Sequence, residues 1–161
     1  MEGSEHLKRA IELWQEAYRH QMAGELDRAI EIYERSIEAH PTAEAHTFKG
    51  WAMSFQGRLE EARDECLKAI EVDPEFGNPY NDIGVYLMQQ GKFDEAIPWL
   101  ERAKQAKRYE PRQFPFMNLG RIYLKQGRWW DALREFEEGA RVAPNNVEAR
   151  RALHDLRGRL N

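Results

Sequence analysis

The chain has 161 residues, of which 42% are apolar and 32% are charged, and its formal net charge is −4. This length predicts a single domain, and this composition is typical of a globular, mostly helical protein rather than a disordered one. No apolar run approaches the ~20 residues of a membrane span, and the N-terminus lacks the apolar core of a signal peptide. The single cysteine, Cys66, has no internal disulfide partner. We therefore expect a cytoplasmic protein.

The charges are unevenly distributed along the chain. Residues 1–101 hold 10 basic and 21 acidic residues, a net charge of −11, whereas residues 102–161 hold 14 basic and 7 acidic residues, a net charge of +7. Such an asymmetry indicates interactions with charged partners. It allows either head-to-tail association of copies of the chain or capture of an acidic partner at the basic end.

In chain order, four similar segments follow one another, each with a glycine and, five residues later, an alanine. The successive glycines are 33, 34 and 36 residues apart, and the alanines keep the same spacing. A fixed period of this length indicates a repeat architecture. The glycines are Gly24, Gly57, Gly91 and Gly127, and the alanines are Ala29, Ala62, Ala96 and Ala132.

Each segment is predicted to form two helices, called here the A helix and the B helix. An apolar periodicity of 3.6 residues runs up to the glycine, is interrupted, and resumes after an acidic residue that suits the start of a helix. Pro41, Pro74 and Pro144 end the B helix in three of the segments. Small residues on the A helices, together with the repeated alanines of the B helices, predict a close approach within each pair. They are Ala17, Gly50, Gly84 and Gly120.

The four segments are expected at about residues 10–42, 43–76, 77–112 and 113–146. The third has Arg108 where the others have proline, and the insertion KRYEPRQFP that follows predicts a bent connection. Residues 147–160 are predicted to form a capping helix with a polar outer side, because no further unit covers it.

The spacing W-x2-L-G-x2-Y, then A-x3-F, then P resembles the signature of the tetratricopeptide repeat family. The resemblance covers about residues 10–144 and implies an all-α, right-handed solenoid of four helical hairpins closed by the capping helix. The last segment matches best, with Phe116, Leu119, Gly120, Tyr123, Ala132, Phe136 and Pro144.

The resemblance also implies that the A helices line a concave groove that receives an extended peptide or a helix of another protein. Its lining changes from aromatic to amide and carboxylate groups and then to basic groups, so the expected peptide is apolar at one end and acidic at the other. We expect Trp51 and Asn118 to contribute most to binding, while Phe48 is equally well explained as a core residue. The expected lining residues are Trp14, Tyr18, Phe48, Trp51, Phe55, Asn81, Asp82, Val85, Met88, Met117, Asn118, Arg121 and Lys125.

No feature of the sequence indicates catalysis. It has no phosphate-binding glycine loop, no nucleophile elbow and no cluster of cysteine and histidine. We therefore expect no enzymatic activity, no cofactor and no metal. The carboxylate clamp with which some tetratricopeptide proteins bind chaperone C-termini is also absent. The matching positions hold Trp14, Tyr18, Phe48, Asn78 and Asp82.

Two alternatives to a peptide-binding adaptor remain open. The first is a self-assembling scaffold, formed head to tail or through a stripe on the first helix that either packs locally or mediates a homo-oligomer. The second is a binder of an acidic or nucleic-acid partner, although the net negative charge and the lack of a nucleic-acid motif count against nucleic acid. The stripe comprises Leu7, Ile11, Trp14, Tyr18 and Met22, and the basic residues are Arg102, Lys104, Lys107, Arg108, Arg112, Arg121, Lys125 and Arg128.

Glu16 and Lys49 lie 33 residues apart, at matching positions of adjacent A helices where the last segment has Leu119. Two opposite charges in place of two apolar residues predict an ion pair between the first two segments.

Overall fold

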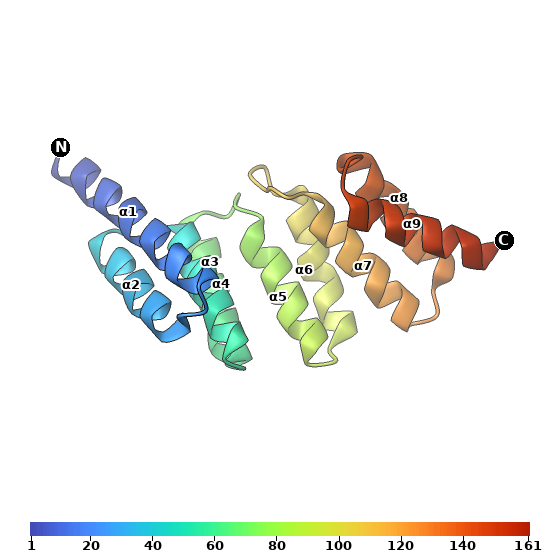
Figure 1. Ribbon diagram of the computed structural model, residues 1–161, viewed down its shortest axis with the longest axis horizontal. Helices are drawn as coiled ribbons and strands as arrows, with labels where there is room; N and C mark the ends of the chain where they lie inside the picture. Colours follow the sequence, from blue (N-terminus) through green and yellow to red (C-terminus); the bar gives the residue numbers. More distant parts are fainter.

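The computed structural model describes all 161 residues and contains nine α-helices. Helical hairpins follow one another along the long axis, and the two termini lie at opposite ends (Figure 1). The expected all-α solenoid is confirmed. None of the nine helices is long and apolar enough to cross a membrane. The helices are α1 (Glu2–Met22), α2 (Leu26–Ala39), α3 (Ala43–Phe55), α4 (Leu59–Val72), α5 (Asn78–Gln89), α6 (Phe93–Gln105), α7 (Gln113–Lys125), α8 (Trp129–Val142) and α9 (Val147–Leu160).

The hairpin turns are built on the repeated glycines. Gly24, Gly57, Gly91 and Gly127 have φ values between +71° and +81°, a region that residues with a side chain rarely adopt. Each glycine follows the last turn of α1, α3, α5 or α7, so the chain can reverse within a few residues and begin the next helix. These four positions therefore set the hairpin geometry.

The small residues of the A helices allow the hairpins to close. A methyl group at Gly50 would lie 2.8 Å from the carbonyl oxygen of Ala62, and one at Gly84 would lie 2.5 Å from the Leu100 side chain. Gly120 similarly lies against the ring of Phe136. The predicted close approach is thus confirmed for the second, third and fourth pairs.

The A helices lie side by side in chain order, because α1 contacts α3, α3 contacts α5 and α5 contacts α7. Each also packs against its own B helix, and the core runs between the two rows. Tyr33, Ile83, Leu100 and Leu119 are among its fully buried side chains. We call the surface formed by α1, α3, α5 and α7, together with the adjoining end of α9, the A-helix face.

The connection between α6 and α7, residues 106–112, is anchored to the preceding connection. The Arg108 N–H donates a hydrogen bond to the Glu75 carbonyl over 3.0 Å, and the Gly77 N–H donates one to the Arg108 carbonyl over 2.9 Å. Tyr109 is buried, and its side chain occupies the space that a side chain at Gly77 would need. The expected bend thus has a defined position beside α5.

Lys49 does not pair with Glu16, so that prediction is wrong. Its Nζ lies 3.1 Å from Glu65 Oε1 and 3.7 Å from Glu34 Oε1, because these B-helix carboxylates are nearer than the neighbouring A helix. His46 Nδ1 lies 2.8 Å from the other oxygen of Glu65. Burial alone raises the pKa of Glu65, but the hydrogen bond to His46 and the charge of Lys49 outweigh it and lower that pKa to about 2.

Candidate functional site

The N-terminal part of the A-helix face holds a cavity of about 390 Å³, called here the aromatic pocket. Side chains of α1, α3 and α5, of the connection before α7 and of the first turn of α7 line it. Most of the lining is aromatic, and the remainder is amide, carboxylate and proline. The lining residues are Trp14, Tyr18, Phe48, Trp51, Asn78, Asn81, Asp82, Tyr109, Glu110, Pro111 and Phe114.

Five aromatic rings form a continuous row across α1 and α3. The ring centroids of Trp14 and Tyr18 each lie 5.6 Å from that of Phe48, and Tyr18 also lies 6.5 Å from Trp51. Trp51 in turn lies 5.4 Å from Phe55. All four pairs are tilted at distances typical of favourable aromatic contacts. The row remains open to solvent, since Tyr18 is 37% and Phe55 60% exposed.

The charged groups that line the aromatic pocket are both carboxylates, Asp82 and Glu110. Burial raises the pKa of Asp82 to about 7, and a hydrogen bond with Asn81 offsets only part of this effect. No cation of the chain contributes to the pKa of Asp82. A partly buried carboxyl group thus lies among aromatic rings without a counter-charge.

A second cavity of about 660 Å³, the apolar–basic pocket, lies where α5, α7 and α9 come together. Its floor is apolar, and the charged side chains that line it are Arg121, Lys125 and Arg159, with no acidic residue. Arg121 also lies 2.6 Å from a carboxylate oxygen of Glu148. The two pockets of the A-helix face therefore carry opposite charge. The lining residues of the second are Val85, Met88, Gln89, Phe93, Arg121, Leu124, Lys125, Trp129 and Arg159.

The structure divides the expected groove residues between these two pockets. Phe55 lies outside both pockets but extends the aromatic row from Trp51. The aromatic pocket includes Trp14, Tyr18, Phe48, Trp51, Asn81 and Asp82, and the apolar–basic pocket includes Val85, Met88, Arg121 and Lys125.

Met117 and Asn118 are buried, with 2% and 8% of their surfaces exposed, and neither lines a pocket of this face. Met117 belongs to the core and packs against Gly139. Asn118 accepts a hydrogen bond from Arg121 over 2.9 Å and donates one to Asn81 over 3.0 Å. Contrary to expectation, Met117 does not line the groove, and Asn118 orients its neighbours from below it.

Several pocket residues were not predicted from the sequence. Tyr109, Glu110 and Phe114 reach the aromatic pocket because the inserted connection bends back toward α5. Phe93 and Trp129 reach the apolar–basic pocket from the first positions of B helices, two residues after a turn glycine. In the sequence, the insertion before α7 and the aromatic residues that follow two of the turn glycines were the signals that could have indicated these positions.

Half of the eight basic residues expected to capture an acidic partner are paired with carboxylates of the chain, namely Lys104, Arg108, Arg121 and Arg128. Arg108 lies 2.7 Å from Glu44 and 2.6 Å from Asp73, so it links the second and third segments. Lys104 lies 2.9 Å from Glu135. Charge reversal at Arg108 would break these contacts between repeats and so would disturb the fold as well as any binding at this end.

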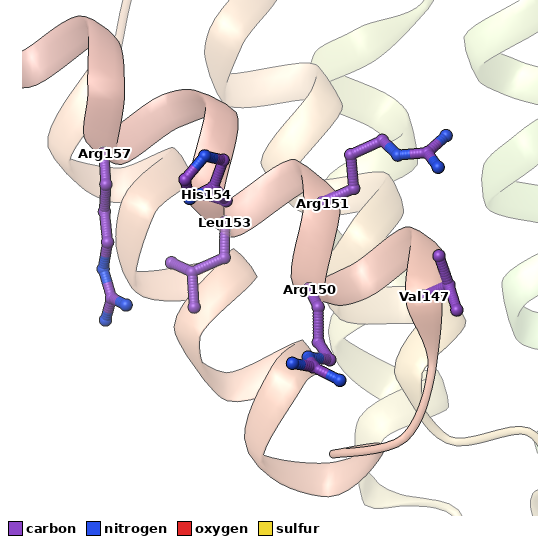
Figure 2. A pocket seen from close by; sticks show the side chains of 6 residues that line it. All are labelled: Val147, Arg150, Arg151, Leu153, His154 and Arg157. Atoms are coloured by element: carbon purple, nitrogen blue, oxygen red, sulfur yellow. The ribbon is translucent and has the colours of Figure 1, made fainter.

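Basic residues without a strong internal partner gather on α9. Figure 2 shows Arg150, Leu153 and Arg157 projecting from one side of this helix, beside a shallow cavity of about 520 Å³. Val147, at the start of the helix, is 65% exposed. Because residues of α9 alone line this cavity, it is an exposed helix face rather than an enclosed site.

Sequence comparison identifies relatives of the chain. Two family models, both described as tetratricopeptide repeat, match residues 15–76 and 75–145. The type IV pilus assembly protein PilF of Pseudomonas aeruginosa is 29% identical over 133 residues, which cover 81% of this chain and 50% of that protein. The small glutamine-rich tetratricopeptide repeat-containing protein 2 of Mycosarcoma maydis is 32% identical over 97 residues, or 59% of this chain and 27% of that protein. The chain therefore spans half or less of the length of these two relatives.

A third relative, the photosystem I assembly protein Ycf3 of Prochlorococcus marinus, is 29% identical over 119 residues, or 67% of this chain and 69% of that protein. Among solved structures, Pseudomonas aeruginosa PilF matches with a TM-score of 0.86 at 24% identity, covering 94% of this chain and 69% of that one. A thermophilic tetratricopeptide protein of Thermus thermophilus matches with a TM-score of 0.75 at 20% identity, covering 89% and 79%. These structural matches show a common fold, and the two family models together cover most of the chain. The chain belongs to the tetratricopeptide repeat family.

Proposed function

We propose that the chain is a non-enzymatic adaptor whose A-helix face binds an extended segment or a helix of a partner protein. Tetratricopeptide proteins are generally protein-interaction modules, which supports the class of function. Two of the relatives are named for the assembly of larger complexes, a pilus and photosystem I. An adaptor role for this chain is consistent with both names.

The observation that carries this proposal is the open aromatic row on α1 and α3. Rings that served only the core would be covered, yet Tyr18 and Phe55 are 37% and 60% exposed, and Phe114, which also lines the pocket, is 40% exposed. Contiguous exposed apolar surface on a folded chain marks interaction sites. Large aromatic side chains also act as anchors in protein interfaces.

The charges of the two pockets support an oriented partner. The apolar–basic pocket offers Arg121, Lys125 and Arg159 around an apolar floor, which suits a segment with apolar and acidic side chains. The aromatic pocket carries only negative charge, from Asp82 and Glu110. A segment that spans both pockets would therefore bind in one direction.

Affinity capture with matched variants tests this proposal. Trp51→Ala combined with Phe55→Ala removes the centre of the aromatic row, whereas Trp130→Ala removes an aromatic ring that is 66% exposed on α8, outside both pockets. We expect proteins captured by the wild type to be lost with the double variant and retained with Trp130→Ala, all three proteins having the same helix content. Equal capture by all three would contradict the proposal.

A second candidate is self-association, which the opposite net charges of residues 1–101 and 102–161 favour. Leu7 and Met22, at either end of the first-helix stripe, are 38% and 52% exposed and could be covered in such an assembly. Light scattering at low and high salt tests this alternative, because attraction between separated charges is screened beyond about 10 Å at 0.1 M salt. A mass that stays monomeric at low salt excludes it.

A further inference from the structure

We propose that the aromatic pocket binds a cationic side chain, a lysine or an arginine of a partner protein, between its aromatic rings and the carboxylate of Asp82. This inference rests on the proposed function, because it assigns the chemistry of one site on the same A-helix face. It also changes the expected partner, from a segment that is simply apolar at this end to one that carries a positive charge there.

The shape and composition of the pocket suit such a group. Trp14, Tyr18, Phe48 and Trp51 line it together with Phe114. The face of an aromatic ring attracts a cation, most strongly for tryptophan, and the attraction grows when the site excludes water. The aliphatic stem of a lysine or arginine can pack against the same rings.

The charges of the pocket favour a cation over a neutral or anionic group. Its two ionisable carboxyl groups belong to Asp82 and Glu110, and no lysine, arginine or histidine lines it. Burial disfavours the ionised form of Asp82, and no internal cation compensates for this. A positive side chain from a partner would supply the missing counter-charge, whereas an acidic one would lie among carboxyl groups that offer it none.

Elsewhere the chain places its own cations over aromatic rings. The Arg102 guanidinium lies 4.8 Å from the ring centroids of both Tyr80 and Trp99, and that of Arg128 lies 4.3 Å from the centroid of Tyr123. No cation of the chain lies over a ring of the aromatic pocket. The largest aromatic cluster of the surface is thus left for an external cation.

The net charge of the surrounding part of the chain also favours a cation at this pocket. The pocket lies mainly in the part of the chain with a net charge of −11, which attracts positive groups during association. The cations of the same face, Arg121, Lys125 and Arg159, lie together in the other pocket. A partner segment with a basic residue at one end and acidic residues at the other would match both.

Short peptides test the assignment directly on the full chain. The probes are capped pentapeptides of glycine with one central residue: arginine, lysine, or their uncharged counterparts citrulline and norleucine. Binding is followed by the indole N–H signals in a ¹H–¹⁵N spectrum, in which Trp14 and Trp51 report on the pocket. Trp99 and Trp130, which line neither pocket of the A-helix face, are internal controls.

We expect the arginine and lysine peptides to shift the Trp14 and Trp51 signals, and the citrulline and norleucine peptides to bind at least about 10-fold more weakly, a difference of about 1.4 kcal/mol. Asp82→Asn, which keeps the size of the side chain, should remove most of this preference. Glu95→Gln removes one negative charge from the B helix α6, outside both pockets, and should leave the preference intact.

Equal binding of charged and uncharged peptides overturns the proposal, as does unchanged binding by Asp82→Asn. Absence of any shift of both indole signals up to the solubility limit of the peptides also overturns it. The proposed function fails separately, if the Trp51 and Phe55 double variant captures the same proteins as the wild type. If that capture is lost in the double variant but unchanged in Asp82→Asn, the cation assignment alone is wrong.

Discussion

Asn118 on α7 donates a hydrogen bond to Asn81 on α5, with 3.0 Å between Asn118 Nδ2 and Asn81 Oδ1. Both side chains are buried, and Arg121 donates to the remaining polar atom of Asn118, its Oδ1. The sequence pattern suggested that Asn118 contacts a ligand. Its hydrogen bonds instead tie adjacent A helices together and position Asn81 in the aromatic pocket.

Asn118→Ala should therefore lower the free energy of unfolding by about 1–3 kcal/mol, because it leaves the buried Asn81 oxygen without its donor. Urea unfolding of Asn118→Ala, Asn81→Ala and the double variant measures the coupling. Additive effects would show that the hydrogen bond contributes nothing to stability.

Asp82 should make stability depend on pH. Its pKa is about 7 in the folded chain, above the ordinary value of 3.8, so the folded state binds a proton that the unfolded state releases. The contribution of this proton to the free energy of unfolding is fully present below about pH 4 and is lost as the pH rises toward 7. It amounts to no more than about 4 kcal/mol. Tyr86, Tyr109 and Cys66 face Asp82, and burial raises their pKa values, so they stay neutral throughout this range.

Asp82→Asn should accordingly be more stable than the wild type near pH 8 and gain little near pH 5, as measured by urea unfolding at both values. Glu95→Gln is the matched control for the loss of one surface charge, and its effect should remain small at both pH values. If Asp82→Asn raised the free energy of unfolding by the same amount at both pH values, this would contradict the conclusion that Asp82 is a partly buried carboxyl group without a counter-charge. A more stable variant with weaker peptide binding would show that Asp82 serves binding at a cost to stability.

The ion pairs around Glu65 should contribute to the stability of the chain. Only 6% of the Glu65 side chain and 13% of the Lys49 side chain are exposed, so Glu65→Leu leaves a poorly solvated cation and should cost about 3–5 kcal/mol. A double-mutant cycle should find strong coupling between Glu65 and Lys49 and additive effects for Glu16 and Lys49. Coupling of Glu16 instead of Glu65 would contradict the observed pairing.

Gly120 and Gly158 form a matched pair for the close packing of the hairpins. Gly120→Ala would push a methyl group into the Phe136 ring and should cost about 1–3 kcal/mol. Gly158→Ala, in α9 with nothing within 4 Å of the new methyl group, should stabilise the chain by about 0.5–1 kcal/mol. Thermal unfolding distinguishes them, and equal effects would show that the Gly120 contact is unimportant.

The helical hairpins could be predicted from the sequence because each depends on local signals. Glycines such as Gly24 mark turns, and small residues such as Gly50 and Gly84 mark the contacts within a pair. Both signals recur in every segment, so the fourfold repetition made them recognisable. Within each segment, these signals predict two helices.

The contacts between segments could not be predicted in the same way. Lys49 approaches Glu34 and Arg108 bonds Glu44 because of the angle at which successive hairpins stack, which no single segment encodes. The aromatic pocket depends likewise on the inserted connection, whose residue Tyr109 reaches α5 only after the third hairpin is placed. Most of the A-helix residues expected in the groove line one of the two pockets, whereas the pocket residues of the inserted connection were not predicted.

Photo-crosslinking measures most directly whether the A-helix face binds a partner segment. A photoreactive phenylalanine analogue replaces Phe114, which lines the aromatic pocket, in one protein and the more exposed Trp130, on α8, in another. We expect position 114 to crosslink to one segment of a captured protein that contains a lysine or arginine, and the crosslink to be lost in the Trp51 and Phe55 double variant. Crosslinks formed equally from both positions, or only from position 130, would contradict binding at this face.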